Sequence, residues 1–223
     1  MYELEITKHF SKVPIFRFAD AAQIIQNRQY AKKFLSRMVK ENKVFKVKKD
    51  YYTLYDDPFL ISTFLIKPSY ISSVSALGYH RLITQISREV FCFTTKASSS
   101  MDFFETVNFI HTRHFFGFEM KPYGGFAIPI ATPEKAVIDS ISAVPLSVVE
   151  EAFESLDKKA MVNCLKKINK PCIAKRIGCL MEKHGHDVYS ELKGCLNYRR
   201  IFLDPLGRKN GKLNRKWGVI DNT

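Results

Sequence analysis

"QNRQYAKKFLSRMVKENKVFKVKKDYY", residues 26–52, combines a helical period with a high density of positive charge. Between Gln26 and Lys49 it holds nine Lys or Arg residues and one acidic residue, Glu41. Apolar residues recur at helical spacing within 28–42, at Ala31, Phe34, Leu35 and Met38. Polar and cationic residues take the opposite face: Gln29, Lys32, Lys33, Ser36, Arg37 and Lys40. The charge is therefore segregated onto one side of an amphipathic helix.

The flanking residues predict the elements around this helix. Downstream, "KVFKVKKDYYTLY" alternates with a period of two, which predicts two strands around a turn at Asp50, a residue that tolerates left-handed geometry. Upstream, we expect a helix within residues 1–12, a short strand at 15–18, and a short helix that Asp20 caps. This order of elements is typical of a winged helix-turn-helix, in which the basic helix reads DNA and the hairpin is the wing.

The side chains of the helix and hairpin match the chemistry of duplex DNA. Residues that read base edges begin the helix, at Asn27, Arg28 and Gln29. Phosphate-binding types follow on the same face: Lys32, Lys33, Ser36, Arg37 and Lys40. The wing adds Lys46, Lys48 and Lys49. We expect a double-stranded operator with inverted repeats, bound by a homodimer. The alternative is a solvated basic helix beside a polar hairpin.

Composition gives independent support for an anionic partner. The 223 residues carry a formal net charge of +13, and the pI is about 9.5. No apolar run reaches the roughly 18 residues of a membrane helix, and the first residues do not resemble a signal peptide. The sequence therefore predicts a cytoplasmic protein.

The cysteines and histidines do not follow the spacing of a metal site. The five cysteines are odd in number and include no CxxC, so we expect reduced and mostly buried thiols. Cys172 and Cys179 are spaced to share one buried helix face. The histidine pairs 111/114 and 184/186 have no cysteine or carboxylate partner at ligand spacing. We expect no metal and no cofactor.

The rest of the chain predicts an α+β protein with two domains. "YDDPF" at 55–59 marks the boundary between a winged helix-turn-helix domain, 1–57, and a mixed α/β domain, 58–223. In the second domain we expect a helix over about 69–82, strands in "EVFCFTT" and "VNFIHTRHFF", and a hairpin around Gly124 and Gly125. A helical part begins at about residue 133, with Thr132 as N-cap, and further helices start at Asp157, Pro171 and Asp187.

The C-terminal tail, residues 193–223, has eight Lys or Arg against one acid before Asp221. It is either a disordered, solvated end or a basic arm that orders on a partner. The candidate partner-binding residues are Arg208, Lys209, Lys212, Arg215 and Lys216.

Catalytic motifs are absent from the sequence, which has no Gly-rich phosphate loop, no GxSxG and no HExxH. One catalytic alternative is a nuclease site built from Asp102, Glu134 and Lys135. No cluster of strand-borne acids accompanies these residues, and Glu134 is explained as a first-turn acid. We therefore expect that the chain is not an enzyme.

Four segments resemble a known family. "KVKKDYYTLY" resembles the wing of AbiEi-type antitoxins, which has two basic residues, a glycine and an aromatic pair; here Asp50 takes the place of the glycine. "KPSYISSVSAL" is similar to that family's segment after the wing, and "ATPEKAVIDSI" to its Pro-Glu-Lys-Ala motif. "LDPLGRKNGKLNRKWGV" resembles its C-terminal end. The resemblance covers residues 1–143 and the tail.

This resemblance implies a transcriptional autorepressor that is also the antitoxin of a type IV toxin–antitoxin pair in abortive phage defence. The toxin of such a pair has a nucleotidyltransferase fold, and the antitoxin need not bind it directly. Two other readings stay open at this point: a winged-helix regulator whose second domain senses a ligand, and a nucleic-acid-processing enzyme.

Overall fold

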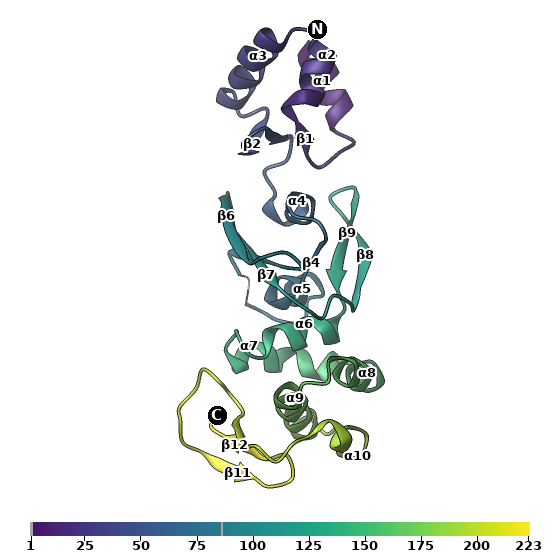
Figure 1. Ribbon diagram of the computed structural model, residues 1–223, viewed down its shortest axis with the longest axis vertical. Coiled ribbons are helices and arrows are strands. Elements are labelled where there is room, and N and C mark those ends of the chain that lie inside the picture. The colour runs from purple at the N-terminus through teal and green to yellow at the C-terminus, as the bar shows by residue number, and fades with distance from the viewer. Residues whose placement is uncertain (1, 86) are drawn as a thin grey trace.

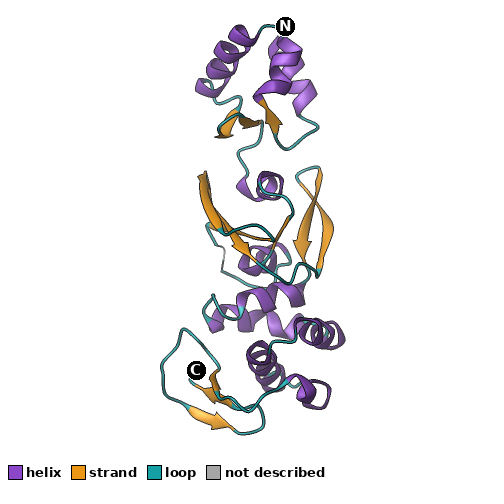
Figure 2. Ribbon diagram, in the orientation of Figure 1, coloured by secondary structure: helices purple, strands orange, loops and turns teal. Residues whose placement is uncertain are grey.

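The computed structural model describes residues 2–85 and 87–223. The molecule is elongated, with the N-terminal helices at one end, a twisted sheet in the middle and the C-terminal helices at the other end (Figures 1 and 2). This arrangement confirms the predicted α+β class. None of the helices in the described part of the chain combines the length and apolar character that a membrane-spanning segment requires.

The N-terminal unit has the element order that the sequence predicts. Its elements are α1 (Tyr2–Phe10), β1 (Phe16–Arg17), α2 (Phe18–Ile25), α3 (Arg28–Lys40), β2 (Phe45–Lys48) and β3 (Tyr51–Thr53). The strands form an antiparallel sheet in the order β1-β3-β2. Three helices with a small three-stranded sheet give the winged helix-turn-helix topology.

The start of α2 differs from the prediction. The helix begins at Phe18, so Asp20 lies at its third position and is not the N-cap. The Asp20 carboxylate instead accepts a hydrogen bond of 2.8 Å from the backbone N–H of Arg17, which is the N-cap residue. The apolar alternation at 15–18 therefore yields a strand of two residues, Phe16–Arg17, because Phe18 already belongs to α2 and Ile15 lies before the strand.

The central unit contains a six-stranded mixed sheet in the order β6-β7-β5-β4-β9-β8, in which the β4–β9 and β5–β7 pairs are parallel. Its strands are β4 (Ser69–Ile71), β5 (Glu89–Thr94), β6 (Ser99–Phe103), β7 (Glu105–His111), β8 (Phe118–Tyr123) and β9 (Phe126–Ala131). Its first two helices are α4 (Pro58–Leu65) and α5 (Ser73–Tyr79). The predicted hairpin is confirmed, with Gly124 and Gly125 at φ 55° and 82° in its turn.

The helix predicted over about 69–82 is wrong in its first part. Residues Ser69–Ile71 form β4, and the helix covers Ser73–Tyr79. β4 lies inside the sheet, where it pairs with β5 on one side and β9 on the other. All three of its residues are buried, so tertiary pairing overrides the local signal.

The C-terminal part is mostly helical, as predicted. It contains α6 (Pro133–Ser140), α7 (Leu146–Glu150), the short 3-10 helix η1 (Glu151–Ser155), α8 (Lys158–Ile168), α9 (Pro171–Lys183), α10 (Tyr189–Leu192) and the 3-10 helix η2 (Lys193–Cys195). Thr132 and Asp157 cap α6 and α8 through their side chains, which confirms the predicted N-cap at Thr132 and the predicted helix start at Asp157. Pro171 opens α9.

The tail is neither disordered nor fully solvated. It forms a small sheet of β10 (Ile201–Phe202), β11 (Lys212–Asn214) and β12 (Val219–Asp221). Trp217 is 1% exposed, and its indole N–H donates a hydrogen bond of 2.6 Å to Glu182 of α9. A Cβ at Gly178 would overlap the Trp217 ring, so α9 needs a glycine where the tail docks.

The buried apolar side chains form two clusters. The smaller one lies within residues 6–44 and contains Phe10 and Phe16, whose rings stack at 3.9 Å. The larger one runs from Leu60 to Val219, and it also takes Val47 from the wing. The wing thus packs against the second unit as well as its own. The domain boundary between 57 and 58 stays a prediction.

Fewer of the cysteines are buried than the sequence predicts. Cys92 and Cys179 are buried, while Cys164 and Cys195 are half-buried. Cys172 is exposed, so it does not share the buried face of Cys179. It sits in the first turn of α9, one residue after Pro171, where the helix has just emerged from the α8–α9 connection.

Candidate nucleic-acid interface

Helix α3 starts abruptly after α2, and local geometry explains why. Gln26 adopts a left-handed conformation, φ 59°, that ends α2. Asn27 is the N-cap of α3, and its side-chain oxygen accepts a hydrogen bond of 2.9 Å from the N–H of Tyr30. The cap satisfies one of the free donors at the helix start, which stabilises the helix by about 1 kcal/mol. The two helices are therefore joined by a two-residue turn.

The apolar residues of α3 lie on its buried face and the polar residues on its exposed face, as predicted. Ala31, Phe34, Leu35 and Met38 are buried against the N-terminal core. Burial of each larger side chain contributes about 1.5–3 kcal/mol. All predicted contact residues of the helix are exposed: Asn27, Arg28, Gln29, Lys32, Lys33, Ser36, Arg37 and Lys40. In Figure 1, α3 and β2 lie on one side of this unit, and α1 and α2 on the other.

Few acids neutralise this face. Among the described residues, the ion pairs nearby are Arg37 with Glu41, at 3.8 Å, and Lys43 with Glu3 and Glu41, at 2.6 and 3.0 Å. Five lysines of the face form no ion pair within the described part of the chain: Lys32, Lys33, Lys40, Lys46 and Lys49. Their ammonium groups are available for an external anion.

Two arginines are positioned by aromatic rings. The Arg28 guanidinium lies 5.3 Å from the centroid of the Phe18 ring, which belongs to the first turn of α2. The Arg37 guanidinium lies 5.2 Å from that of Phe34. Such stacking limits the conformations of a long side chain and leaves its N–H groups free to donate.

The wing holds its three predicted lysines differently. Lys46, Lys48 and Lys49 are all exposed. Lys48, however, donates a hydrogen bond of 3.2 Å to the Leu65 carbonyl at the end of α4, and its Nζ lies 4.5 Å from the Tyr51 ring centroid. Lys48 therefore links the wing to the second unit, whereas Lys46 and Lys49 extend freely.

The predicted tail residues are all exposed, and they are spread around the tail sheet: Arg208, Lys209, Lys212, Arg215 and Lys216. Two of them already have internal partners. Lys216 pairs with Glu182 and with Asp187, and Lys209 donates to the Pro205 carbonyl at 3.0 Å. The structure therefore does not gather the five into one free arm.

The structure contains a buried polar cluster that the sequence patterns above do not predict. Lys135 of α6 is fully buried and pairs with Asp139 one turn later. Asp139 also accepts hydrogen bonds from Ser72 (2.7 Å) and from the Tyr70 hydroxyl (3.1 Å), and Lys135 donates to Tyr70 (2.7 Å). Burial lowers the pKa of Lys135 and raises those of Asp139 and Tyr70. The Lys–Asp spacing of four residues in the Pro-Glu-Lys-Ala segment was the available signal.

The three residues of the nuclease alternative each contact another part of the chain. The Glu134 carboxylate accepts a hydrogen bond of 3.1 Å from the N–H of Asp157, and so ties α6 to the start of α8. Asp102 accepts one of 2.9 Å from Thr106 on the neighbouring strand. Lys135 is enclosed in the cluster described above. Each of the three groups already has a structural partner.

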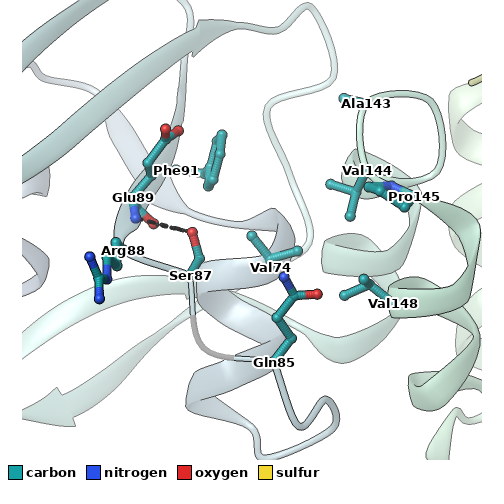
Figure 3. Close-up of a pocket in the computed structure, with 10 residues that line it drawn as sticks. All are labelled: Val74, Gln85, Ser87, Arg88, Glu89, Phe91, Ala143, Val144, Pro145 and Val148. Carbon is teal, nitrogen blue, oxygen red and sulfur yellow. Dashed lines mark hydrogen bonds between the residues drawn. The ribbon is translucent and has the colours of Figure 1, made fainter.

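A surface hollow of about 410 Å³ lies between β5 and the segment that leads into α7 (Figure 3). Val74, Val144 and Val148 contribute apolar side chains to its lining, with Gln85 next to Val148, and Arg88 lies apart from them. Ser87 donates a hydrogen bond of 3.1 Å to the Glu89 carbonyl within this wall. The hollow is remote in sequence from the basic face, since none of its residues belongs to the N-terminal unit.

Comparisons with known proteins address the fold. No family model matches the chain, and no curated protein matches it. Among solved structures, the chain is similar to the crystal structure of the RV2827C protein from Mycobacterium tuberculosis, with a TM-score of 0.72. The match covers 99% of this chain and 91% of that chain, at 8% sequence identity. The two proteins therefore share their architecture over nearly the whole length.

Proposed function

We propose that this chain is a transcriptional regulator that binds double-stranded DNA, with α3 in the major groove and the wing on the flanking backbone. The observation that carries the proposal is the exposed cationic face of α3, which is backed by a buried apolar stripe. Lys32, Lys33 and Lys40 on this face form no ion pair with any acid of the described residues. Base-reading types at the helix start and phosphate-binding types along it fit this role. A homodimer on an inverted repeat would place two such helices in successive grooves.

The finer proposal is that the regulator represses its own operon and serves as the antitoxin of a type IV pair with a nucleotidyltransferase-fold toxin. The motifs in the wing, after the wing and in α6 support it. Two of them have clear physical roles here: the wing turn at Asp50 and the buried Lys135–Asp139 pair. Direct binding of the toxin is not required. We further propose that the chain has no catalytic activity of its own.

The test is the salt dependence of DNA binding by a Lys32→Ala/Lys33→Ala double variant, on duplex DNA from upstream of its own coding region. Each lost phosphate contact lowers the slope of log K against log salt by about 0.9, so we expect a decrease of about 1.8. A charge-matched control is Lys96→Ala/Lys121→Ala, whose lysines lie in the central unit and should leave the slope unchanged. An unaltered slope in the first variant would refute the assignment of these contacts.

A second arm examines base readout by Arg28. Arg28→Ala should relax the preference at one operator position, with a loss of about 1–3 kcal/mol for the best base. Competition between single-base operator variants measures this loss. A uniform weakening over all sequences would assign Arg28 to the backbone instead.

A further inference from the structure

A second cavity, of about 340 Å³, lies between the end of α4 and the β8–β9 hairpin. Its lining includes the apolar side chains of Phe64, Phe115, Phe118 and Met120. Cavities of this size, with aromatic walls and few polar groups, are typical of small-molecule sites. Met120 is 60% exposed, and the flexible methionine side chain adapts to ligands of different shape.

One polar group in this wall has no partner. Thr63 is 4% exposed, and its hydroxyl is a buried side-chain oxygen without a hydrogen bond among the described residues. Helical threonines commonly donate to the carbonyl four residues earlier, but here the Phe59 carbonyl accepts from Ser62 at 2.9 Å. A buried hydroxyl without a partner is unfavourable. Because this oxygen is not accessible from the cavity, Thr63 belongs to the wall and offers no polar contact to a bound molecule.

The mouth of the cavity carries a positive charge. Lys67 is exposed, and its ammonium group lies 5.2 Å from the Phe64 ring centroid, so it is held over the cavity wall. Among the described residues Lys67 forms no ion pair. An anionic group on a bound molecule would therefore find an available counter-charge at this point.

We propose that this cavity binds a small aromatic carboxylic acid. The ring lies among Phe64, Phe115 and Phe118, and the carboxylate pairs with Lys67. The volume, the aromatic wall and the single charge at the mouth together favour this class. The site is separate from the basic face of α3 and does not depend on DNA binding.

The first experiment titrates the full-length chain with 2-naphthoate and with its uncharged isostere 2-naphthamide. For a ligand of this size we expect saturable binding with a Kd of about 1 mM or tighter. The naphthoate should bind several-fold more tightly than the amide, because it pairs with Lys67. In chain labelled at the methionine methyl groups, the Met120 resonance should move under the ring current. Buried Met38, Met161 and Met181 should not move.

Variants then locate the site. Ala127 also lines this cavity, so Ala127→Phe should fill it and abolish the Met120 shift. Ala143→Phe, which fills the hollow of Figure 3, is the matched control and should leave binding unchanged. Lys67→Gln should remove the preference for naphthoate, and Lys96→Gln should preserve it. Thr63→Val should raise the melting temperature of the free chain and leave the preference for naphthoate unchanged.

Several results would overturn the proposal. These are the absence of a saturable Met120 shift in the folded wild-type chain, binding that survives in Ala127→Phe, and equal affinity for the two probes. If Ala127→Phe does not fold, the Met120 shift in the wild type and the effect of Lys67→Gln decide the question.

Discussion

Residue 50 shows how the wing turn limits the choice of side chain. Asp50 has φ 63°, in the left-handed region that favours glycine, and its carbonyl accepts a hydrogen bond of 2.9 Å from the N–H of Phe18. That bond ties the turn to the start of α2. Aspartate is one of the few other residues that visit this region at modest cost. The geometry thus explains why aspartate fits this turn and why glycine would fit it as well.

The Asp139 carboxylate is the main counter-charge of the buried Lys135 ammonium group. Asp139→Asn would leave Lys135 buried without its counter-charge, so we expect a loss of about 3–5 kcal/mol in the free energy of unfolding. Urea denaturation measures it. The control is the double variant Lys135→Met/Asp139→Leu, which removes both charges and should be less destabilised than Asp139→Asn. If Asp139→Asn were as stable as the wild type, the pair would be structurally unimportant.

The same variant should acquire a characteristic pH dependence. Burial lowers the pKa of Lys135, and Asp139 is the first group that raises it again. Without Asp139 the pKa falls further below its unfolded value of about 10.4. Between the two values the unfolded chain binds more protons than the folded chain. The stability of Asp139→Asn should therefore rise with pH in that window, more steeply than that of the wild type.

Thiol reactivity should separate the exposed cysteine from the buried ones. Burial raises the pKa of Cys92 to about 12, and it also raises that of Cys179. A thiol-specific reagent at about pH 8 should therefore modify Cys172 first and Cys92 only when the chain unfolds. The kinetics of labelling measure this order, and Cys172→Ser should eliminate the fast phase. A fast phase that persists in this variant would show that Cys172 is not the accessible thiol.

At the scale of elements, the sequence predicts those structures whose signals are local. Helix α3 was predictable because its cap, its apolar stripe and its basic face all lie within fifteen residues. Strand β4 was not, because Ser69–Ile71 become a strand through pairing with β5 and β9, which are distant in sequence. The tail sheet was missed for the same reason: its order depends on the docking of Trp217 against Gly178 and Glu182.

The features of the candidate site also differ in whether they depend on local sequence or on contacts with distant residues. The exposed face of α3 follows from periodicity alone. The different environments of Lys48 and Lys49 do not, since the Leu65 carbonyl that holds Lys48 belongs to another unit. The Lys135–Asp139 spacing is visible in the sequence, but its partners Tyr70 and Ser72 come from a segment that sequence reasoning placed in a helix.

The wing lysines should therefore behave differently on substitution. Lys49→Ala should lower the salt slope of DNA binding by about 0.9 and leave stability unchanged. Lys48→Ala removes the bond to Leu65, so it should lower the free energy of unfolding by about 1 kcal/mol. Paired salt titrations and urea denaturation of the two variants measure these effects. If the two variants had the same salt slope and the same free energy of unfolding, the Lys48–Leu65 hydrogen bond would make no measurable contribution to stability.

At the scale of the whole molecule, the two apolar clusters differ in whether they include a buried residue from the other unit. The smaller cluster draws all its buried residues from 6–44. The larger one draws its buried residues from 60–219 except for Val47 of the wing. Trp217 and Val219 belong to this larger cluster, so the tail is part of the second unit and not an independent arm.

This arrangement leads to a test of the antitoxin half of the proposal. A fragment of residues 58–223 keeps nearly all of the larger cluster and loses Val47 and the Lys48–Leu65 contact. We expect it to fold with reduced stability and to lose operator binding. If the antitoxin proposal holds, the fragment should still rescue growth against the nucleotidyltransferase-fold toxin that the proposal requires. Circular dichroism and cooperative thermal unfolding establish folding before the rescue assay.

A second fragment makes the rescue assay interpretable. Residues 58–196 lack the tail and with it Trp217, which is 1% exposed in the intact chain. Loss of that side chain from the core should cost about 3–5 kcal/mol, so this shorter fragment should be markedly less stable. Lys212→Ala/Arg215→Ala in the 58–223 fragment keeps Trp217 and removes tail charge alone. Rescue by that variant would show that Lys212 and Arg215 are not required for neutralisation. Failure of a folded 58–223 fragment would show either that neutralisation requires the N-terminal unit or that the protein is only a regulator.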